Sequence, residues 1–266
     1  MSEQKKFSNI AVDRWGAGVT ITLNRPEKLN PMDWDTLAEL RLAVEDLEKD
    51  LSVRTVVFTG SGRAFSAGGD LDKYLGLFKK PEDFRFFVEQ FYKLFEVMEM
   101  SPKIYIAAIN GVCVAGGIEL LLACDLVIAS EDAQIGDGHL NFGQLPGAGS
   151  SIRLWRAVGA TRAKHLLMTG DMLTARQAFD MGLVGEVTPA GGLEAGYKAL
   201  AAKLHAKSPV GMKGAKFLMN EAVRSDLERA LRVEIAYVVK YATTESDPIE
   251  GLMAFKEKRA PNFKSL

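Results

Sequence analysis

The chain has 266 residues, of which 47% are hydrophobic, a length that suits one large domain or one domain with an appendage. Its formal net charge of −1 excludes the basic surface of a nucleic-acid-binding protein, and its composition excludes a disordered chain. Because no apolar run reaches the ~18 residues of a membrane span and the polar N-terminus lacks the apolar segment of a secretory signal, we expect a cytoplasmic protein.

The first part of the chain alternates predicted strands and helices. Apolar residues alternate with threonines over Val19–Leu23, the period of a half-buried strand. A leucine and valine stripe running to Leu51 predicts an amphipathic helix, with Asp33 or Asp35 as its cap. The same reasoning predicts strands at 7–12, 55–59, 104–109 and 125–130, and helices at 84–100, from about 150, and from Thr174 to Gly182. Short strands separated by helices indicate a mostly parallel α/β core.

The last part of the chain is predicted to be helical. Helices are expected at 193–207, 210–223, 226–241 and 248–258, and Asp247-Pro248-Ile249-Glu250 has the pattern of a helix start with a capping box. We therefore predict two parts, an α/β part over 1–190 and a helical part over 191–266. A loose strand–strand–helix recurrence between residues 19 and 124 indicates a solenoid-like spiral.

Two glycine turns follow predicted strands, Ala67-Gly68-Gly69-Asp70 and Ala115-Gly116-Gly117. If the strands are parallel neighbours, both turns lie at the same sheet edge, and each offers a backbone N–H to one carbonyl oxygen. Two such donors stabilise an enolate, and losing one typically costs about 3–4 kcal/mol. Glu119, in the first helical turn that follows, should point toward the same oxygen as an acid or base. The alternative is a close-packed turn with Glu119 reaching solvent.

The sequence lacks the motifs of nucleotide-binding, serine-nucleophile and metal sites. No nucleotide-binding glycine motif follows a strand, there is no nucleophile elbow, and no two histidines have metal-ligand spacing, so we expect no metal. His165 and His205 are expected to be structural. Cys113 and Cys124 lie in apolar surroundings, which predicts buried thiols in a reducing compartment.

Six segments carry a family resemblance. They are NRPEKLN at 24–30, GRAFSAGGDLD at 62–72, IAAINGVCVAGGIELLLACD at 106–125, AQIGDGHLNFGQLPGAGSSIRL at 133–154, LMTGDMLTARQAFDMGLV at 167–184 and EGLMAFKEKRAPNF at 250–263. In this order, and over nearly the whole chain, they resemble the crotonase superfamily of enoyl-CoA hydratases and isomerases. The resemblance implies a crotonase-like ββα spiral core, an acyl-CoA-binding region, and a helical C-terminal region that forms a homotrimer or a dimer of trimers.

The resemblance also implies the substrate and where it binds. The substrate would be an acyl-CoA thioester, with CoA as part of the substrate and no separate cofactor. The thioester oxygen would lie between the N–H groups of Gly69 and Gly116. The adenine and phosphates would lie along the residues Lys28, Leu29, Ala67, Gly68 and Asp70, and Lys258 would reach the CoA of a neighbouring subunit.

The catalytic pair departs from the family pattern. Enoyl-CoA hydratases use two glutamates on one water; the first falls on Glu119, but the position of the second holds His139. A carboxylate and an imidazolium can do similar work, with His139 as the acid and Glu119 as the base. Asp137 would orient the imidazole or act directly; alternatively, Asp137 and His139 only hydrogen-bond the loop. We therefore predict a hydratase-like lyase of fatty acid or aromatic acid metabolism.

Two other functions remain open from the sequence. The Asp-Gly-His segment also resembles a branch of the superfamily that hydrolyses a C–C bond in cyclic β-diketones. That branch has an aspartate in the following glycine turn, where this chain has Ala148. The third possibility is an acyl-CoA binder without catalysis, which the missing second glutamate supports and the retained Glu119 does not.

Overall fold

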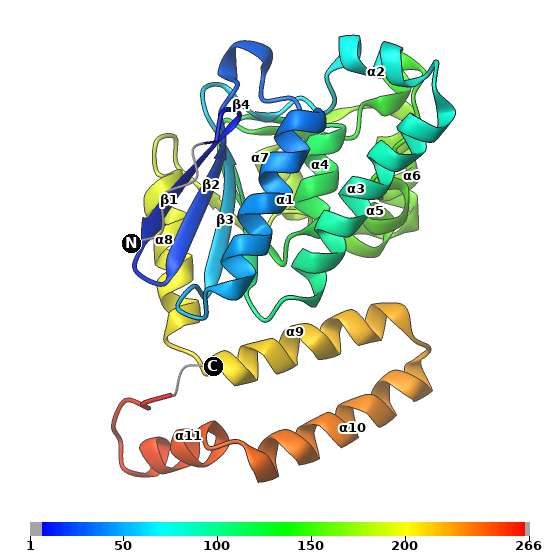
Figure 1. The fold of residues 1–266 in the computed structure, drawn as a ribbon. Helices are drawn as coiled ribbons and strands as arrows, with labels where there is room; N and C mark the ends of the chain where they lie inside the picture. Colours follow the sequence, from blue (N-terminus) through cyan, green and yellow to red (C-terminus); the bar gives the residue numbers. More distant parts are fainter. Residues whose placement is uncertain (1–6, 264–266) are drawn as a thin grey trace.

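A six-stranded sheet forms the centre of the computed structural model, which describes residues 7–263 (Figure 1). The polar N-terminal segment 1–6, on which the expectation about a secretory signal largely rests, lies outside the described residues. The strand order is β1–β2–β3–β5–β7–β10, antiparallel between β1 and β2 and parallel elsewhere. The strands are β1 (Ile10–Trp15), β2 (Gly18–Leu23), β3 (Thr55–Gly60), β5 (Ile104–Ile109), β7 (Leu126–Ser130) and β10 (Glu186–Thr188).

A smaller sheet lies at the carboxyl ends of these strands. It contains β4 (Ala64–Ser66), β6 (Val112–Val114), β8 (Gln134–Gly136) and β9 (Met172–Thr174) in that order, with β9 antiparallel to β8. The chain passes from the large sheet to the small one three times, from β3 to β4, β5 to β6 and β7 to β8. Helices follow each passage, which confirms the predicted α/β spiral of ββα turns.

Six helices bury apolar side chains in one core with the large sheet. They are α1 (Trp34–Lys49), α3 (Pro81–Met100), α4 (Gly116–Ala123), α5 (Ser150–Val158), α6 (Ala160–Thr169) and α7 (Ala175–Asp180). Leu37, Leu40 and Val44 of α1 are buried, as predicted, in one core with Phe91 and Phe95 of α3. Asp33 caps α1 by accepting the N–H of Thr36, and Thr174 caps α7 within a capping box.

The C-terminal helices divide into two groups. In α8 (Leu193–His205), Leu193 and Tyr197 pack on Ile106 and Ile128 of the large sheet. Helices α9 (Pro209–Arg224), α10 (Leu227–Thr244) and α11 (Asp247–Lys256) extend beyond the sheet, as Figure 1 shows. The division of the chain at residue 190 stays a prediction. None of the helices within residues 7–263 is long and apolar enough to cross a membrane.

Some local predictions were wrong. No strand or helix was predicted between residues 60 and 84, where the structure has strand β4 and helix α2 (Leu71–Leu77), and α3 begins at Pro81 rather than at residue 84. The predicted capping box at Asp247 does not form, because Ser246 is the N-cap of α11 and Asp247 instead accepts the hydroxyl hydrogen bond of Ser208. Both cysteines are free thiols, but Cys124 is only partly buried.

Candidate active site

The two predicted glycine turns touch each other in the structure. They follow β4 and β6, which are parallel neighbours in the small sheet. Gly68 has a φ of +92°, and a Cβ added there would lie 2.7 Å from the Cβ of Ala115 and 2.9 Å from the amide nitrogen of Gly116. The first hydrogen bonds of α4 run from Ile118 and Glu119 back to Ala115. The N–H of Gly116 precedes these bonds at the positive end of the helix, a position that favours an oxygen with negative charge.

Ala115 keeps this turn in an uncommon conformation. Its φ is +53° and its ψ is −118°, a region that side-chain-bearing residues rarely adopt. Such strain persists only where the surroundings impose it, and it is frequent at active sites. Here the N–H of Ala115 is held by the carbonyl oxygen of Asp137 at 2.8 Å. This bond ties the turn before α4 to the loop after β8.

The residues expected to bind CoA gather beside these turns, with one exception. The short 3-10 helix η1 (Pro26–Lys28) leads into Leu29, whose carbonyl oxygen accepts the N–H of Ala67 at 2.9 Å. The Nζ atom of Lys28 lies 3.7 Å from Oδ2 of Asp70, the N-cap of α2. Lys258 follows α11, which lies at the opposite end of the molecule from α2 (Figure 1). Within one chain, the structure does not bring Lys258 to the site.

Glu119 is buried and held by the backbone of the fourth motif. Its side chain does not reach solvent, because the residue is only 4% exposed. One oxygen, Oε1, accepts the N–H groups of Ala148 at 2.7 Å and Ser150 at 3.1 Å. The other oxygen, Oε2, faces Nε2 of His139 at 4.0 Å.

Asp137 and His139 form a pair on the other side of this gap. Nδ1 of His139, at the start of the 3-10 helix η2 (His139–Phe142), lies 3.0 Å from Oδ1 of Asp137. Oδ2 of Asp137, which is fully buried, accepts the hydroxyl of Ser150 at 2.5 Å. Ser150 therefore holds Asp137 with its side chain and Glu119 with its backbone.

The electrostatics favour a charged imidazole. Burial by itself lowers the pKa of His139, but the hydrogen bond and charge of Asp137 and the charge of Glu119 outweigh it, and the pKa is raised above 6.5. Burial works against the ionised Asp137 as well, yet the hydrogen bonds of His139 and Ser150 bring its pKa below 3.8. Burial raises the pKa of Glu119 above 4.5, although His139 opposes the shift. These shifts favour the charged forms of Asp137 and His139 and make Glu119 a stronger base than an exposed glutamate.

The sequence did not single out two residues of this site. Ser150 begins α5 directly after the glycine turn, and its position at a helix start was its only signal. Tyr74 in α2 packs against Gly69, and it lay in a segment with no predicted element. Within the described residues, no group of three or more His, Cys, Asp and Glu side chains is placed to hold a metal ion.

Comparisons with known proteins agree over almost the full length. A family model described as enoyl-CoA hydratase/isomerase matches residues 16–266. The crotonyl-CoA hydratase of Syntrophomonas wolfei is 35% identical, with 97% of this chain and 99% of that protein covered. The short-chain-enoyl-CoA hydratase of Clostridium acetobutylicum is 33% identical, with 96% and 97% covered.

Solved structures show the same fold. A crystal structure of enoyl-CoA hydratase from Bacillus anthracis has a TM-score of 0.90 and 36% identity, with 97% of this chain and 99% of that chain covered. The structure of DspI from Pseudomonas aeruginosa has a TM-score of 0.91 and 33% identity, with 99% of each chain covered.

Proposed function

Because the chain belongs to the enoyl-CoA hydratase/isomerase family of the crotonase superfamily, we propose that it adds water across the 2,3-bond of an enoyl-CoA thioester. The observation that carries this proposal is the 4.0 Å gap between Glu119 Oε2 and His139 Nε2, each of which is anchored on its other side. A water molecule about 2.8 Å from both atoms fits between them. The pair can thus replace the two glutamates of the usual hydratase.

The thioester oxygen would be stabilised by the two glycine turns. In the proposal, the N–H groups of Gly69 and Gly116 donate to this oxygen as negative charge develops on it. The contact between the turns, seen at Gly68 and Ala115, supports their convergence on one oxygen. Lys28 and Asp70 lie beside the same loops and are proposed to contact the CoA moiety with Leu29, Ala67 and Gly68.

The proton transfers follow from the electrostatics. Glu119 takes a proton from the water as its oxygen attacks the β-carbon of the enoyl group. His139, as the imidazolium, gives a proton to the α-carbon, which converts the enolate to the hydroxyacyl thioester. Glu119 is then neutral and His139 is the neutral imidazole, so one proton passing from Glu119 to His139 restores the starting state.

Hydration of crotonyl-CoA by the wild type and by Glu119→Gln and His139→Ala tests the proposal. We expect each variant to lose about 10²–10⁴-fold in kcat, the usual worth of one general acid or base. His165→Ala is the control, since His165 is exposed and pairs only with Asp171 among the described residues. Full activity in both site variants rejects the roles. Calorimetric binding of acyl-CoA esters without turnover by the wild type supports the non-catalytic binder instead.

A second candidate is hydrolysis of a C–C bond in a cyclic β-diketone, free or as its CoA thioester. The hydrogen bond between Asp137 and His139 favours it, because a carboxylate on Nδ1 leaves Nε2 of a neutral imidazole to accept a proton from water. Against it stands Ala148, which offers Glu119 a backbone N–H where the hydrolase branch has an aspartate. Mass spectrometry detects this reaction as a ring-opened product one water heavier than the diketone.

We also propose that the C-terminal helices form a homotrimer, as a single ring or paired into a dimer of trimers. Apolar side chains are exposed on α10 and α11, among them Leu227, Leu231, Ile235, Leu252 and Phe255. A cavity of about 770 Å³ also lies between the core and α9, lined in part by Leu122, Met212, Met219 and Val223. Exposed apolar surface of this kind is typical of a protein–protein interface.

Ile235→Glu tests the interface, because it places a charge where a neighbour is expected. Light scattering after size exclusion should show a smaller assembly than the wild type, whereas Lys240→Glu on the same helix should keep the wild-type size. A wild type that elutes as a monomer, or an unchanged Ile235→Glu assembly, contradicts the trimer on this face.

A further inference from the structure

The side chain of Tyr74 lies directly against one of the two proposed oxyanion turns. Tyr74 is in the middle of α2, where its N–H donates to the carbonyl oxygen of Asp70. A Cβ added to Gly69 would lie 1.6 Å from Cε2 of the tyrosine ring and 2.5 Å from Cζ, the carbon that carries the hydroxyl. Only glycine at position 69 leaves room for the ring. The hydroxyl-bearing edge of the Tyr74 ring thus lies beside Gly69, whose N–H is one of the two proposed oxyanion donors.

Three phenylalanines fix the orientation of this ring. Phe84 and Phe87 of α3 meet it edge to face, at centroid distances of 6.2 Å and 5.6 Å, and Phe78 stacks on it at 5.9 Å. The free space next to the ring, lined in part by Met32 and Leu77, amounts to about 10 Å³. This space is far too small for a phenol ring to move into. The aromatic packing therefore holds the ring in place.

The hydroxyl of Tyr74 has no hydrogen-bond partner among the side chains and backbone groups of residues 7–263. Two other buried or helical tyrosines show the usual pairing: Tyr105 donates to Glu48 at 2.8 Å and Tyr92 to Glu96 at 3.3 Å. Burial and the negative charge of Glu119 both raise the pKa of Tyr74, so the phenol keeps its proton and remains a donor. A donor held rigidly beside the reacting groups is a ready contact for a substrate oxygen.

We propose that Tyr74 is a specificity-determining residue whose hydroxyl binds an oxygen atom that the acyl group carries beyond its thioester, such as a ketone or a hydroxyl. The inference rests on the proposed function in that the acyl group must lie between Gly69 and Glu119. A site built to hydrogen-bond a substrate oxygen disfavours the analogue that lacks it, because the protein donor is then left unpaired. The enzyme therefore selects oxygenated acyl groups over hydrocarbon acyl groups of equal length.

Calorimetric titration with matched saturated thioesters tests this selection without any hydration taking place. The probes are hexanoyl-CoA, 4-oxohexanoyl-CoA and 5-oxohexanoyl-CoA. The wild type should bind one of the oxo esters about 3- to 10-fold more tightly than hexanoyl-CoA, the range of one neutral hydrogen bond. Tyr74→Phe, which keeps the ring and its packing, should bring the ratio near one. Its Kd for hexanoyl-CoA should not rise above the wild-type value, because the donor that hexanoyl-CoA leaves unpaired is gone. Tyr92→Phe, at an exposed tyrosine of α3, should keep the wild-type ratio.

The possible outcomes separate this inference from the proposed function. A wild type without preference for either oxo ester, a preference that survives in Tyr74→Phe, or no binding of any probe overturns the role of Tyr74. Hydration of crotonyl-CoA is measured in parallel. A preference that depends on Tyr74 in a protein without hydratase activity supports the inference and rejects hydration. Hydratase activity without the preference supports hydration and rejects the role of Tyr74.

Discussion

Glu119 and His139 each have one atom committed to the protein and one atom free toward the other. The backbone N–H groups of Ala148 and Ser150 occupy Oε1 of Glu119, and Asp137 occupies Nδ1 of His139. Oε2 of Glu119 and Nε2 of His139 are thus free to contact one molecule between them. At the scale of single residues, these second contacts fix the positions of Oε2 and Nε2, the two atoms that take and give protons in the proposed reaction.

The substitution Asp137→Asn should move the pH dependence of hydration. The proposed mechanism needs Glu119 ionised and His139 protonated, so in the wild type kcat/KM should rise through the raised pKa of Glu119 and fall through the raised pKa of His139. The amide that replaces the carboxylate has no charge to stabilise the imidazolium, so the pKa of His139 should fall. The high-pH limb of the profile should therefore shift to lower pH.

The measurement is kcat/KM for crotonyl-CoA across the pH range. Asp171→Asn is the matched control, because it removes the carboxylate paired with the exposed His165. An Asp137→Asn profile that is lower but unshifted would mean that Asp137 holds the loop without setting the proton affinity of His139.

Some residues of this candidate site could be predicted from the sequence, and others could not. Glu119 could be placed because the first turn of a helix has a known direction, and Asp137 and His139 because they belong to a motif of the family. Ser150 could not be assigned, since its partners lie 13 and 31 residues away in the chain. Contacts of this kind depend on how separate loops meet, and no local pattern records them.

At the scale of secondary-structure elements, the contact between the turns after β4 and β6 governs the proposed oxyanion site. Gly68→Ala should drive these turns apart, since the new methyl group would meet Ala115 and the backbone of Gly116. A displacement of about 1 Å at such a site can cost about 10²-fold in rate. We expect a loss of this size in kcat/KM.

Gly159→Ala is the control for this substitution. Gly159 also has a positive φ, +84°, but a Cβ there would meet no atom within 4 Å. Both variants carry the backbone strain of alanine at positive φ, and only one carries the clash. Equal activity in the two variants would show that the spacing of the turns does not limit the reaction.

Helix α2 shows where pattern-based prediction fails at this scale. Leu71 and Leu75 are 58% and 63% exposed, so the apolar residues of this helix do not form one buried stripe. With seven residues it is also too short for a period to emerge. By contrast, the longer α1 buries Leu37, Leu40 and Val44 of the predicted stripe, although the last residue of that stripe, Leu51, lies beyond the helix and is 67% exposed.

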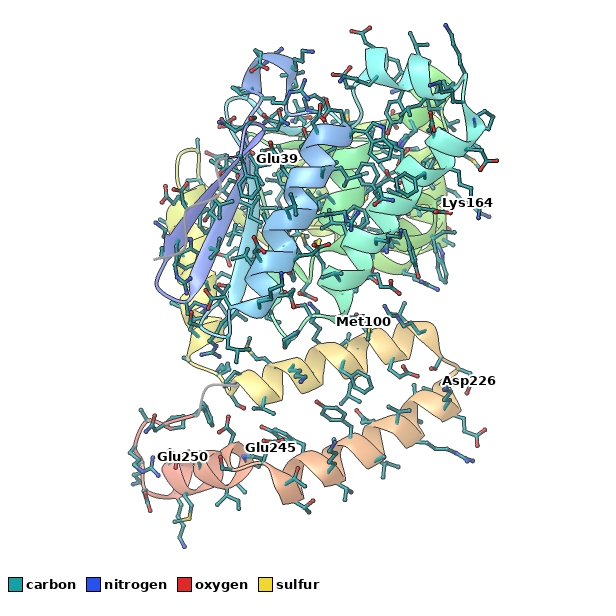
Figure 2. The ribbon with its side chains drawn as sticks, viewed as in Figure 1. Glu39, Met100, Lys164, Asp226, Glu245 and Glu250 are labelled. Atoms are coloured by element: carbon teal, nitrogen blue, oxygen red, sulfur yellow. The ribbon has the colours of Figure 1, made fainter. Side chains whose placement is uncertain are left out.

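At the scale of the whole molecule, one buried lysine joins the C-terminal helices to the core. Lys216 of α9 donates to the carbonyl oxygens of Met98 and Lys103, at 2.7 Å and 2.9 Å, and to Oδ2 of Asp125 at 2.8 Å. These acceptors lie at the end of α3 and before β5 and β7. Met100, close to this junction, lies beside α9 in Figure 2.

Lys216→Met should therefore lower the stability of the folded chain. It leaves the carboxylate of Asp125 buried without its cation, a change that typically costs about 3–5 kcal/mol. For a chain of this size the melting temperature should fall by about 10 °C. Differential scanning calorimetry measures the change, and Lys213→Met, at an exposed position of the same helix, should leave the melting temperature within about 1 °C. A similar melting temperature for both variants would show that Lys216 does not link the C-terminal helices to the core.

The spiral was predictable because a loose strand–strand–helix rhythm recurs between residues 19 and 124 and because family motifs cover nearly the whole chain. What the sequence did not reveal was the small sheet, whose strands have three residues each. Strands of this length have no readable alternation, so they become visible only where neighbouring turns of the spiral pair with one another.

The closeness of Glu119 and His139 has a stereochemical consequence. A conjugated enoyl group is flat, and two groups 4.0 Å apart reach it from the same side. In the proposed hydration, the hydroxyl and the new hydrogen therefore join the same face of the double bond. Because Oε1 of Glu119 is bound to the backbone, its carboxylate cannot turn to serve the opposite face. The product would be a single enantiomer formed by syn addition, and in heavy water its deuterium would occupy one defined position on the α-carbon.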